Sequence, residues 1–221
     1  MGRLLGPAVR ATERPRRRAR RPVRDALNLV DEDVELAPGL RLQILRPPSA
    51  EELIDEAAFD EEEFLPYWAE LWPSGLALAR HVATREVRGL RVLELGCGLG
   101  LPSLAAAVGG AEVLATDWAE DAIEFLRRNA ERNRLFLRVA RVRWSEPEPL
   151  LRAAPWDLVL GADLLYEARN AEQLAQLLPR LGGDVLLAEP GRPYAKDLLD
   201  RFRAEPVAER IHRLPLAGGD G

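Results

Sequence analysis

The chain has 221 residues, enough for one domain with a substantial hydrophobic core. Hydrophobic residues make up 47% and charged residues 30% of it, and no apolar run is long enough to cross a membrane, so we expect a cytoplasmic globular protein and not a membrane protein. The single cysteine, Cys97, excludes an internal disulfide and a metal site built from cysteines alone.

The net charge of −5 is unevenly distributed along the chain. Residues 1–25 contain nine arginines against Glu13 and Asp25, a net +7, so residues 26–221 carry −12. The absence of apolar periodicity in residues 1–25 predicts a disordered Arg-rich tail; a transit peptide, a nucleic-acid arm and an over-extended translation start are alternatives. The acidic remainder argues against a nucleic-acid-binding surface, which requires basic residues to neutralise phosphates.

Residues 26–65 are expected to form an N-terminal hairpin and helix. Residues 34–45 alternate in polarity on both sides of a Pro-Gly turn, which predicts two half-buried strands, an edge ribbon or a lid. Ser49 followed by Glu52 is typical of a capping box that opens a short helix. Residues 51–63 are rich in acids and contain no base; they form either a solvated face or a surface that steers a basic protein substrate.

The segment 66–75 brings two of the five tryptophans, Trp68 and Trp72, close together in the sequence. Pro73 and Ser74 can begin the helix that follows them. The tryptophans are either packing anchors or the wall of a ligand pocket, where an indole ring can stack on adenine or face a cation.

A strand followed by a glycine loop is the central feature of the sequence. The run Val92–Leu95 precedes Gly96, Gly98 and Gly100, and an alanine-rich helix begins next. Such a loop lets the backbone approach a nucleotide-type ligand. The third glycine comes one residue earlier than in the dinucleotide pattern, and Glu94 would repel a diphosphate but suit a cationic ligand, which favours S-adenosylmethionine over NAD.

The next strand, residues 111–116, leads to Asp117, about twenty residues beyond the first glycine. A carboxylate at this position can accept hydrogen bonds from both ribose hydroxyls. Asp117 could equally cap the following helix, and the two roles are compatible. In that helix Asn129 and Asn133 follow the helical period of apolar residues, so we expect structural roles for them.

The rest of the chain alternates between strands and helices. We expect strands at residues 139–143, 156–162, 184–189 and about 207–213, and a helix at about 171–181. This alternation predicts an α/β fold with a doubly wound, mostly parallel sheet.

These pieces together resemble the class I S-adenosylmethionine-dependent methyltransferases, and within them the protein lysine methyltransferases that carry Asp-x-x-Tyr after the fourth strand. The resemblance covers about residues 30–214. The motifs that carry it are Leu71–Gly75, Glu94–Gly100, Asp117, Trp144 and Leu160–Tyr166. The short segment Glu189–Arg192 is also similar to the branch that methylates the β subunit of electron-transfer flavoprotein.

The resemblance implies a Rossmann-like methyltransferase domain over residues 26–221, with its cofactor-binding core at 66–214. Asp163 and Tyr166 would face the methyl-transfer centre. The expected cofactor-binding residues are Trp72, Glu94, Gly96, Cys97, Gly98, Gly100, Asp117, Trp118, Trp144 and Ala162. The sheet of such folds ends in a two-stranded hairpin, whereas this sequence ends with Leu216–Gly221. We therefore expect the last strand to be short or missing.

The expected reaction is methyl transfer to a protein lysine, with Asp163 guiding the departing proton or stabilising the forming ammonium; a capping role for Asp163 and a packing role for Tyr166 are the alternatives. Methyltransferases that act on base amino groups carry Asn-Pro-Pro-Tyr or Asp-Pro-Pro-Tyr after the fourth strand, and Asp163–Tyr166 lacks those prolines. A small-molecule amine is the alternative acceptor, and a non-catalytic S-adenosylmethionine-binding module is the third interpretation. We expect a monomer without a metal, a membrane or a nucleic-acid partner. Its substrate would be a protein such as the electron-transfer flavoprotein β subunit or another protein with a basic surface.

Overall fold

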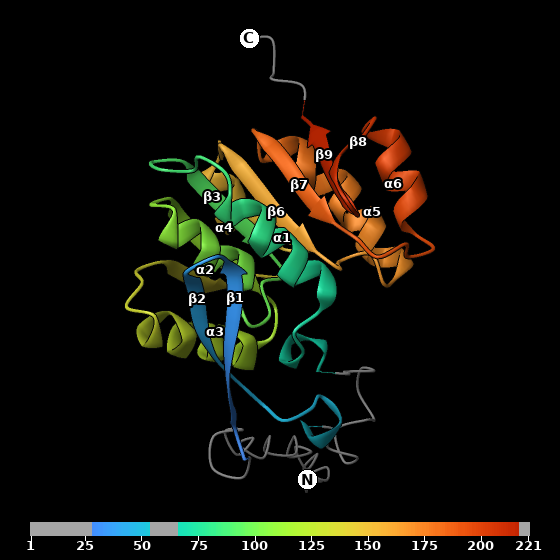
Figure 1. The fold of residues 1–221 in the computed structure, drawn as a ribbon. Coiled ribbons are helices and arrows are strands. Elements are labelled where there is room, and N and C mark those ends of the chain that lie inside the picture. The colour runs from blue at the N-terminus through green and yellow to red at the C-terminus, as the bar shows by residue number, and fades with distance from the viewer. Residues whose placement is uncertain (1–27, 54–65, 217–221) are drawn as a thin grey trace, which may run out of the picture.

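The computed structural model describes residues 28–53 and 66–216, which form one large sheet covered by helices and one separate hairpin (Figure 1). The large sheet has seven strands in the order β5-β4-β3-β6-β7-β9-β8. Strands β3 to β7 are mutually parallel, and β9 runs antiparallel to both of its neighbours. The strands are β3 Arg91–Leu95, β4 Glu112–Asp117, β5 Arg138–Arg141, β6 Leu158–Ala162, β7 Asp184–Ala188, β8 Glu205–Ala208 and β9 Ile211–Pro215. The doubly wound α/β prediction is therefore confirmed.

Alternating side chains of the central strands build a separate hydrophobic core on each face of the sheet. Val92 and Leu160 belong to the core on one face, and Leu93 and Val159 to the core on the other. Helices α1, α2 and α3 cover the first face, and α4, α5 and α6 the second. Their bounds are α1 Pro73–Ala83, α2 Leu101–Val108, α3 Glu120–Arg132, α4 Glu148–Ala153, α5 Ala168–Leu177 and α6 Ala195–Arg201, with short 3-10 turns at η2 Glu51–Leu53, η4 Tyr67–Ala69 and η5 Leu178–Arg180. Burial on both faces explains why these strands read as continuous apolar runs.

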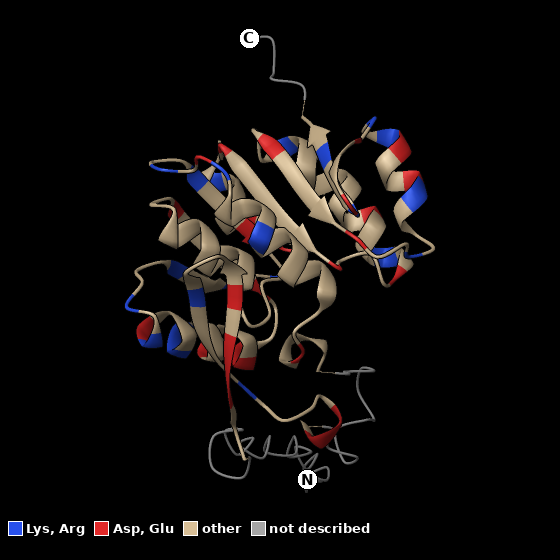
Figure 2. Ribbon diagram, viewed as in Figure 1, with Lys and Arg blue, Asp and Glu red and all other residues tan. Residues whose placement is uncertain are grey.

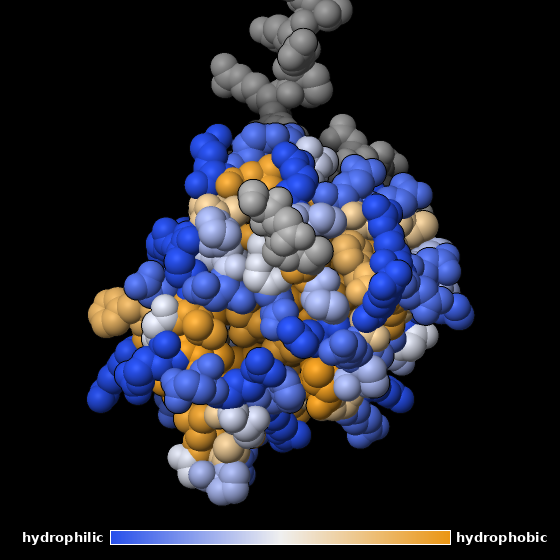
Figure 3. Space-filling model, turned by 90° about the horizontal axis from the view of Figure 1, so that it is seen from above, coloured by the Kyte–Doolittle hydropathy of each residue, from blue (hydrophilic) through white to orange (hydrophobic). Residues whose placement is uncertain are grey.

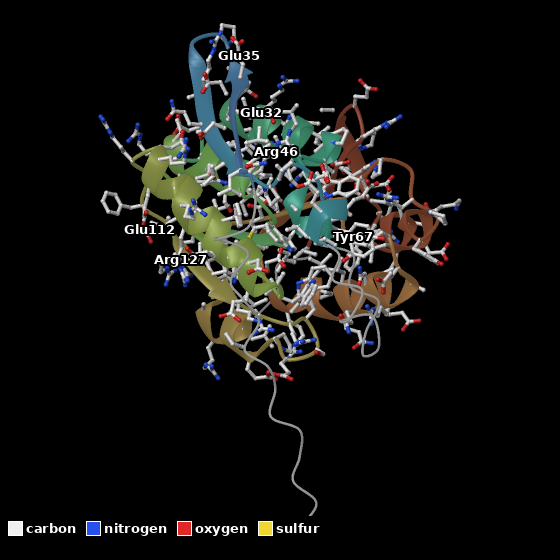
Figure 4. The ribbon with its side chains drawn as sticks, turned by 90° about the horizontal axis from the view of Figure 1, so that it is seen from below. Glu32, Glu35, Arg46, Tyr67, Glu112 and Arg127 are labelled. Carbon is white, nitrogen blue, oxygen red and sulfur yellow. The ribbon has the colours of Figure 1, made fainter. Side chains whose placement is uncertain are left out.

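The predicted N-terminal hairpin is present as β1 Val30–Ala37 and β2 Leu40–Arg46, and it packs against α3 and α1. The Asn133 side chain accepts a hydrogen bond from Gln43 N at 2.9 Å and donates one to Gln43 O at 2.8 Å, while Asn129 Oδ1 accepts one from Leu45 N at 2.8 Å. The structural roles expected for both asparagines are confirmed. In Figure 4 the hairpin carries Glu32 and Arg46, an ion pair of 2.8 Å.

The C-terminal edge of the sheet differs from the prediction. Instead of one strand at 207–213, the chain forms the β8–β9 hairpin, and β9 pairs with β7 from Asp184↔Pro215 to Ala188↔Ile211. The expectation of a short or missing last strand was wrong, because β9 is as long as β7. The turn between β8 and β9 places Arg210 at φ 58 without using a glycine, so the sequence contained no turn signal there.

Other predicted elements have different bounds in the structure or lie outside the described part of the chain. Helix α5 begins three residues before the predicted start, and α4 was not anticipated. Ser49 Oγ accepts a hydrogen bond from Glu52 N at 3.3 Å at the start of η2, as a capping box requires. The tail at 1–25 and most of the acidic run at 51–63 lie outside the described residues.

The described surface is polar and mixed in charge. In Figure 2 acidic and basic residues lie mainly on the hairpin and on the outer faces of the helices, whereas the sheet is largely uncharged. The end seen from above in Figure 3 combines hydrophilic side chains with apolar ones. Within residues 28–53 and 66–216, no helix has the length and apolar character needed to span a bilayer, and no group of three or more His, Cys, Asp or Glu is placed to hold a metal ion.

Candidate active site

A cavity of about 290 Å³ opens at the carboxyl ends of the parallel strands. The loops after β3, β4, β5 and β6 line it, together with the segment before α1. Strands β3 and β6 are neighbours in the sheet although β4 and β5 intervene in the sequence, so this is the point where the strand order reverses. Open α/β sheets bind their ligands at such a point. Figure 4 views this end from below, with Tyr67 labelled near its centre.

Every residue predicted for the site lines this cavity except Gly100. The predicted residues that do so are Trp72, Glu94, Gly96, Cys97, Gly98, Asp117, Trp118, Trp144, Ala162, Asp163 and Tyr166. They come from five separate segments of the chain, which the parallel strands bring to one edge. None of the hairpin residues 30–46 lines the cavity, so the hairpin is a ribbon on α3 and not a lid.

The glycine loop is held in a conformation that few other residues adopt. Gly98 has φ 50, and a Cβ atom there would lie 3.2 Å from Trp68 O. Cys97 N donates a hydrogen bond to Thr116 O at 2.9 Å, which ties the loop to the end of β4. Burial raises the pKa of the Cys97 thiol well above its ordinary value, so Cys97 stays a neutral small residue inside the loop. The loop therefore lines the cavity with Gly96 and Gly98 together with the neutral Cys97.

Gly100 has a packing role instead. It precedes α2 as its N-cap with φ 86, and a Cβ atom there would overlap the Leu126 side chain of α3. The absence of a side chain at Gly100 lets α2 and α3 approach each other. Gly100 was predicted to contact the cofactor, but it is not among the residues that line the cavity.

Glu94 is a buried carboxyl group at the cavity wall, 1% exposed. Its Oε2 accepts hydrogen bonds from Ser103 N at 2.8 Å and from Ser103 Oγ. Burial raises the pKa of Glu94 to about 8, the hydrogen bonds from Ser103 oppose this shift, and the nearby Asp117 adds to it. Glu94 thus fixes the first turn of α2, and a cation that entered the cavity would favour its ionised form.

Asp117 links the glycine loop to α3. Its Oδ2 accepts a hydrogen bond from Gly98 N at 3.0 Å and its Oδ1 accepts one from Ala119 N at 2.9 Å. Burial raises the pKa of Asp117, while the backbone hydrogen bonds from Ala119, Gly98 and Trp118 act in the opposite direction. A carboxylate has about four acceptor positions, and these three backbone donors leave about one of them for a ligand hydroxyl. The expected role as the cap of α3 was wrong, because Ala119 is the N-cap of that helix and no side chain caps it; Asp117 instead binds the N–H of that N-cap residue.

Aromatic side chains form one wall of the cavity. Trp72 Nε1 donates a hydrogen bond to Tyr67 O at 2.7 Å, and the Tyr67 and Tyr166 ring centroids are 5.1 Å apart. Trp68 stacks against Phe125 of the core at 5.2 Å, so it is both a packing anchor and part of the lining. Burial raises the pKa of Tyr166, which keeps its hydroxyl neutral. The sequence did not predict Tyr67 for the site, because its contact with Tyr166 joins two segments that are far apart in the chain.

Asp163 lines the cavity directly after β6, with φ 55 and 7% exposure, and the lining that follows β6 is called the far end, as distinct from the loop end that follows β3 and β4. Arg192 Nε donates to Asp163 Oδ1 at 2.8 Å, and the second guanidinium nitrogen donates to Oδ2 at 3.1 Å. The sequence predicted Asp163 for this site but not Arg192, which lies 29 residues away. The available signal was its position after β7, the strand that neighbours β6.

Comparison with known proteins places this chain in a family. The family model described as lysine methyltransferase matches residues 59–188. The electron transfer flavoprotein beta subunit lysine methyltransferase of Xenopus laevis is 38% identical over 161 residues, which cover 69% of this chain and 60% of that protein. The protein N-lysine methyltransferase METTL21A of Danio rerio is 34% identical over 146 residues, covering 62% of this chain and 66% of that protein.

A solved structure supports the fold. The T. thermophilus 16S rRNA N2 G1207 methyltransferase RsmC, in complex with AdoMet and guanosine, superposes with a TM-score of 0.60 at 20% identity, covering 84% of this chain and 49% of that one. The chain spans 60% of the length of the Xenopus laevis relative and 56% of its Homo sapiens counterpart. The family match extends over more than half of this chain and includes the glycine loop, Asp117 and Asp163. The chain belongs to the lysine methyltransferase family.

Proposed function

We propose that this protein transfers a methyl group from S-adenosylmethionine to a lysine side chain of a protein substrate. The observation that carries the proposal is that one cavity is lined both by the glycine loop with Asp117 and by Asp163 with Tyr166. Family membership and the lysine methyltransferases among the relatives support the same activity.

The residues at the loop end fit this cofactor. Gly96 and Gly98 line the cavity with a positive φ that side chains rarely allow, and Asp117 retains about one acceptor position for a ribose hydroxyl. Glu94 supplies a carboxyl group that a cationic ligand would ionise. When bound, S-adenosylmethionine supplies a methyl group activated by a sulfonium.

The residues at the far end would receive and orient the acceptor amine. A lysine amine has an ordinary pKa of about 10.4, so it must lose a proton before its lone pair can attack. The lone pair forms the new N–C bond as the C–S bond breaks, and the electron pair of that bond stays on sulfur. The proton lost from nitrogen passes to solvent, with the Asp163 carboxylate as its hydrogen-bond acceptor on the way. The rings of Tyr67 and Tyr166 favour a cation beside them.

The substrate we propose is a protein with a basic surface, such as the electron-transfer flavoprotein β subunit. The name of the Xenopus laevis relative and the net charge of −12 over residues 26–221 support this choice, since an acidic body attracts a basic partner. We also propose a cytoplasmic monomer. The single, buried Cys97 is compatible with a reducing compartment.

Transfer of a labelled methyl group tests the proposal. The full chain is incubated with methyl-labelled S-adenosylmethionine and either cell lysate or purified electron-transfer flavoprotein β subunit, with heat-inactivated enzyme as the control. We expect label in a protein band and, after acid hydrolysis, in methyllysine. Label found only in methylarginine or only in small molecules would contradict the proposed acceptor.

A further inference from the structure

Two buried acids follow directly from neighbouring strands at the far end of the cavity. Ala162 of β6 and Ala188 of β7 are paired in the sheet, so Asp163 and Glu189 are the next residues on each strand. Asp163 N donates a hydrogen bond to Ala188 O at 2.9 Å, which keeps the two strand ends together. The two residues are 7% and 6% exposed. Two buried carboxylates this close in the fold require compensating donors.

Glu189 obtains its donors from the turn that follows it. Gly191 N donates to Glu189 Oε1 at 3.0 Å, and Arg192 N donates to Oε2 at 2.9 Å. Gly191 has φ 100, a conformation that side chains rarely allow, so the turn depends on glycine at that position. The carboxylate of Glu189 therefore fixes the backbone from which the Arg192 side chain starts.

Asp163 obtains its donors from the Arg192 side chain. The two hydrogen bonds, at 2.8 and 3.1 Å, match the planar fork of a guanidinium to the plane of the carboxylate. The Arg192 side chain is 35% exposed, whereas that of Asp163 is 5% exposed. The hydrogen bond with Asp163 raises the pKa of Arg192, burial opposes this shift, and Tyr67 is among the other groups that add to it. The charge of Arg192 thus interacts with Tyr67 of the aromatic wall, although Arg192 is not one of the residues that line the cavity.

We propose that Arg192 is a positioning residue for methyl transfer: held by Glu189, it fixes the plane of the Asp163 carboxylate so that a free lone pair of Asp163 faces the acceptor amine. This inference rests on the proposed function. Each Asp163 oxygen accepts one hydrogen bond from Arg192 and keeps a second acceptor position. Arg192 also supplies the charge that compensates the buried carboxylate, so Asp163 serves as an oriented acceptor and not as a mobile base.

The chain contains a matched control for this ion pair. Arg213 donates to both oxygens of Asp184 at 2.9 and 3.1 Å, across the same sequence separation. This second pair lies at the opposite end of β7, because Asp184 is the first residue of that strand. Arg213→Ala removes the same kind of contact away from the cavity.

The test measures kcat and the KM for S-adenosylmethionine with the acceptor that the parent methylates, and the Kd of S-adenosylhomocysteine. We expect Arg192→Ala to lower kcat by up to about a hundredfold, because small misplacements of reacting groups have effects of that size. Its KM and Kd should stay within about twofold of the parent, and Arg213→Ala should match the parent throughout. Arg192→Lys should recover part of kcat, since lysine keeps the charge without the fork.

A double-mutant cycle separates positioning from a purely structural role. If Arg192 acts through Asp163, adding Arg192→Ala to Asp163→Asn should lower kcat by less than about twofold. The same fold loss in both backgrounds would overturn the inference, as would an Arg192→Ala variant that matches Arg213→Ala. If Arg192→Ala does not fold, Arg192→Lys carries the same comparison. A parent that methylates neither lysate proteins nor the flavoprotein subunit would overturn the proposed function itself, and the inference with it.

Discussion

The two ends of the cavity hold their acidic residues in different ways. At the loop end, backbone N–H groups of nearby residues hold Asp117, and Ser103 holds Glu94. At the far end, a side chain 29 residues away holds Asp163. Both arrangements depend on a strand pairing, β3 with β4 in the first and β6 with β7 in the second, but only the second is completed by a long side chain from a turn.

Under the proposed function, this difference would separate cofactor binding from methyl transfer. Backbone donors are fixed by the fold and produce a rigid cradle, which suits a cofactor of constant shape. A side-chain pair can be altered by a single substitution while the cradle stays intact. We therefore expect substitutions at the loop end to change folding and cofactor affinity, and substitutions at the far end to change turnover.

The largest expected effect on stability comes from Gly100→Ala. The new Cβ atom would overlap Leu126, and the alanine would be held at a positive φ that is unfavourable for it. We therefore expect the free energy of unfolding to fall by about 3 kcal/mol. Gly39→Ala is the control, because Gly39 also has positive φ but no atom within 4 Å of its Cβ position, and it should lose about 1 kcal/mol. Chemical denaturation measures both. Equal losses would show that Gly100 has no packing role.

Asp117→Asn should weaken cofactor binding by about tenfold to a hundredfold, because a charged acceptor for ribose is replaced by an amide. Isothermal titration with S-adenosylhomocysteine measures the change. Asp157→Asn is the matched control: Asp157 Oδ2 also accepts a backbone hydrogen bond, from Arg91 N at 2.7 Å, but at the other edge of the sheet. An Asp117→Asn variant with the affinity of the parent would remove Asp117 from the binding site.

A smaller effect is expected from Glu94 as the pH changes. Because burial raises the pKa of Glu94 from 4.5 to about 8 in the folded state, the unfolded chain releases this proton first, and stability falls as the pH rises from about 4.5 to 8. The slope from one group is at most about 1.4 kcal/mol per pH unit. Glu94→Gln should flatten this decline, as measured by urea unfolding at several pH values.

Two other groups with shifted pKa values, Asp117 and His81, also contribute to the pH dependence of stability. The raised pKa of Asp117 acts in the same direction, and the lowered pKa of His81, caused by burial and by Arg85, acts in the opposite direction below pH 6.5. The difference between the parent and Glu94→Gln therefore reports Glu94 together with its electrostatic interaction with Asp117. A difference that stays constant from pH 5 to 8 would contradict its buried, protonated state.

The sequence predicted the loop end more completely than the far end. The spacing of Gly96, Gly98 and Asp117 is a local pattern that the strand-loop-helix unit turns directly into geometry. Arg192 could not be assigned, because its contact with Asp163 depends on the pairing of two strands and on the path of a turn. The β8–β9 hairpin was missed for a similar reason, since Arg210 makes the turn without glycine.

Parallel measurement of binding and turnover in Asp163→Asn tests the division between the two ends most directly. The substitution preserves the size of the side chain and removes its charge, so we expect S-adenosylhomocysteine to bind within about threefold of the parent while methyl transfer falls by about a hundredfold or more. An Asp163→Asn variant that loses cofactor affinity as strongly as Asp117→Asn, or that retains the turnover of the parent, would contradict this account.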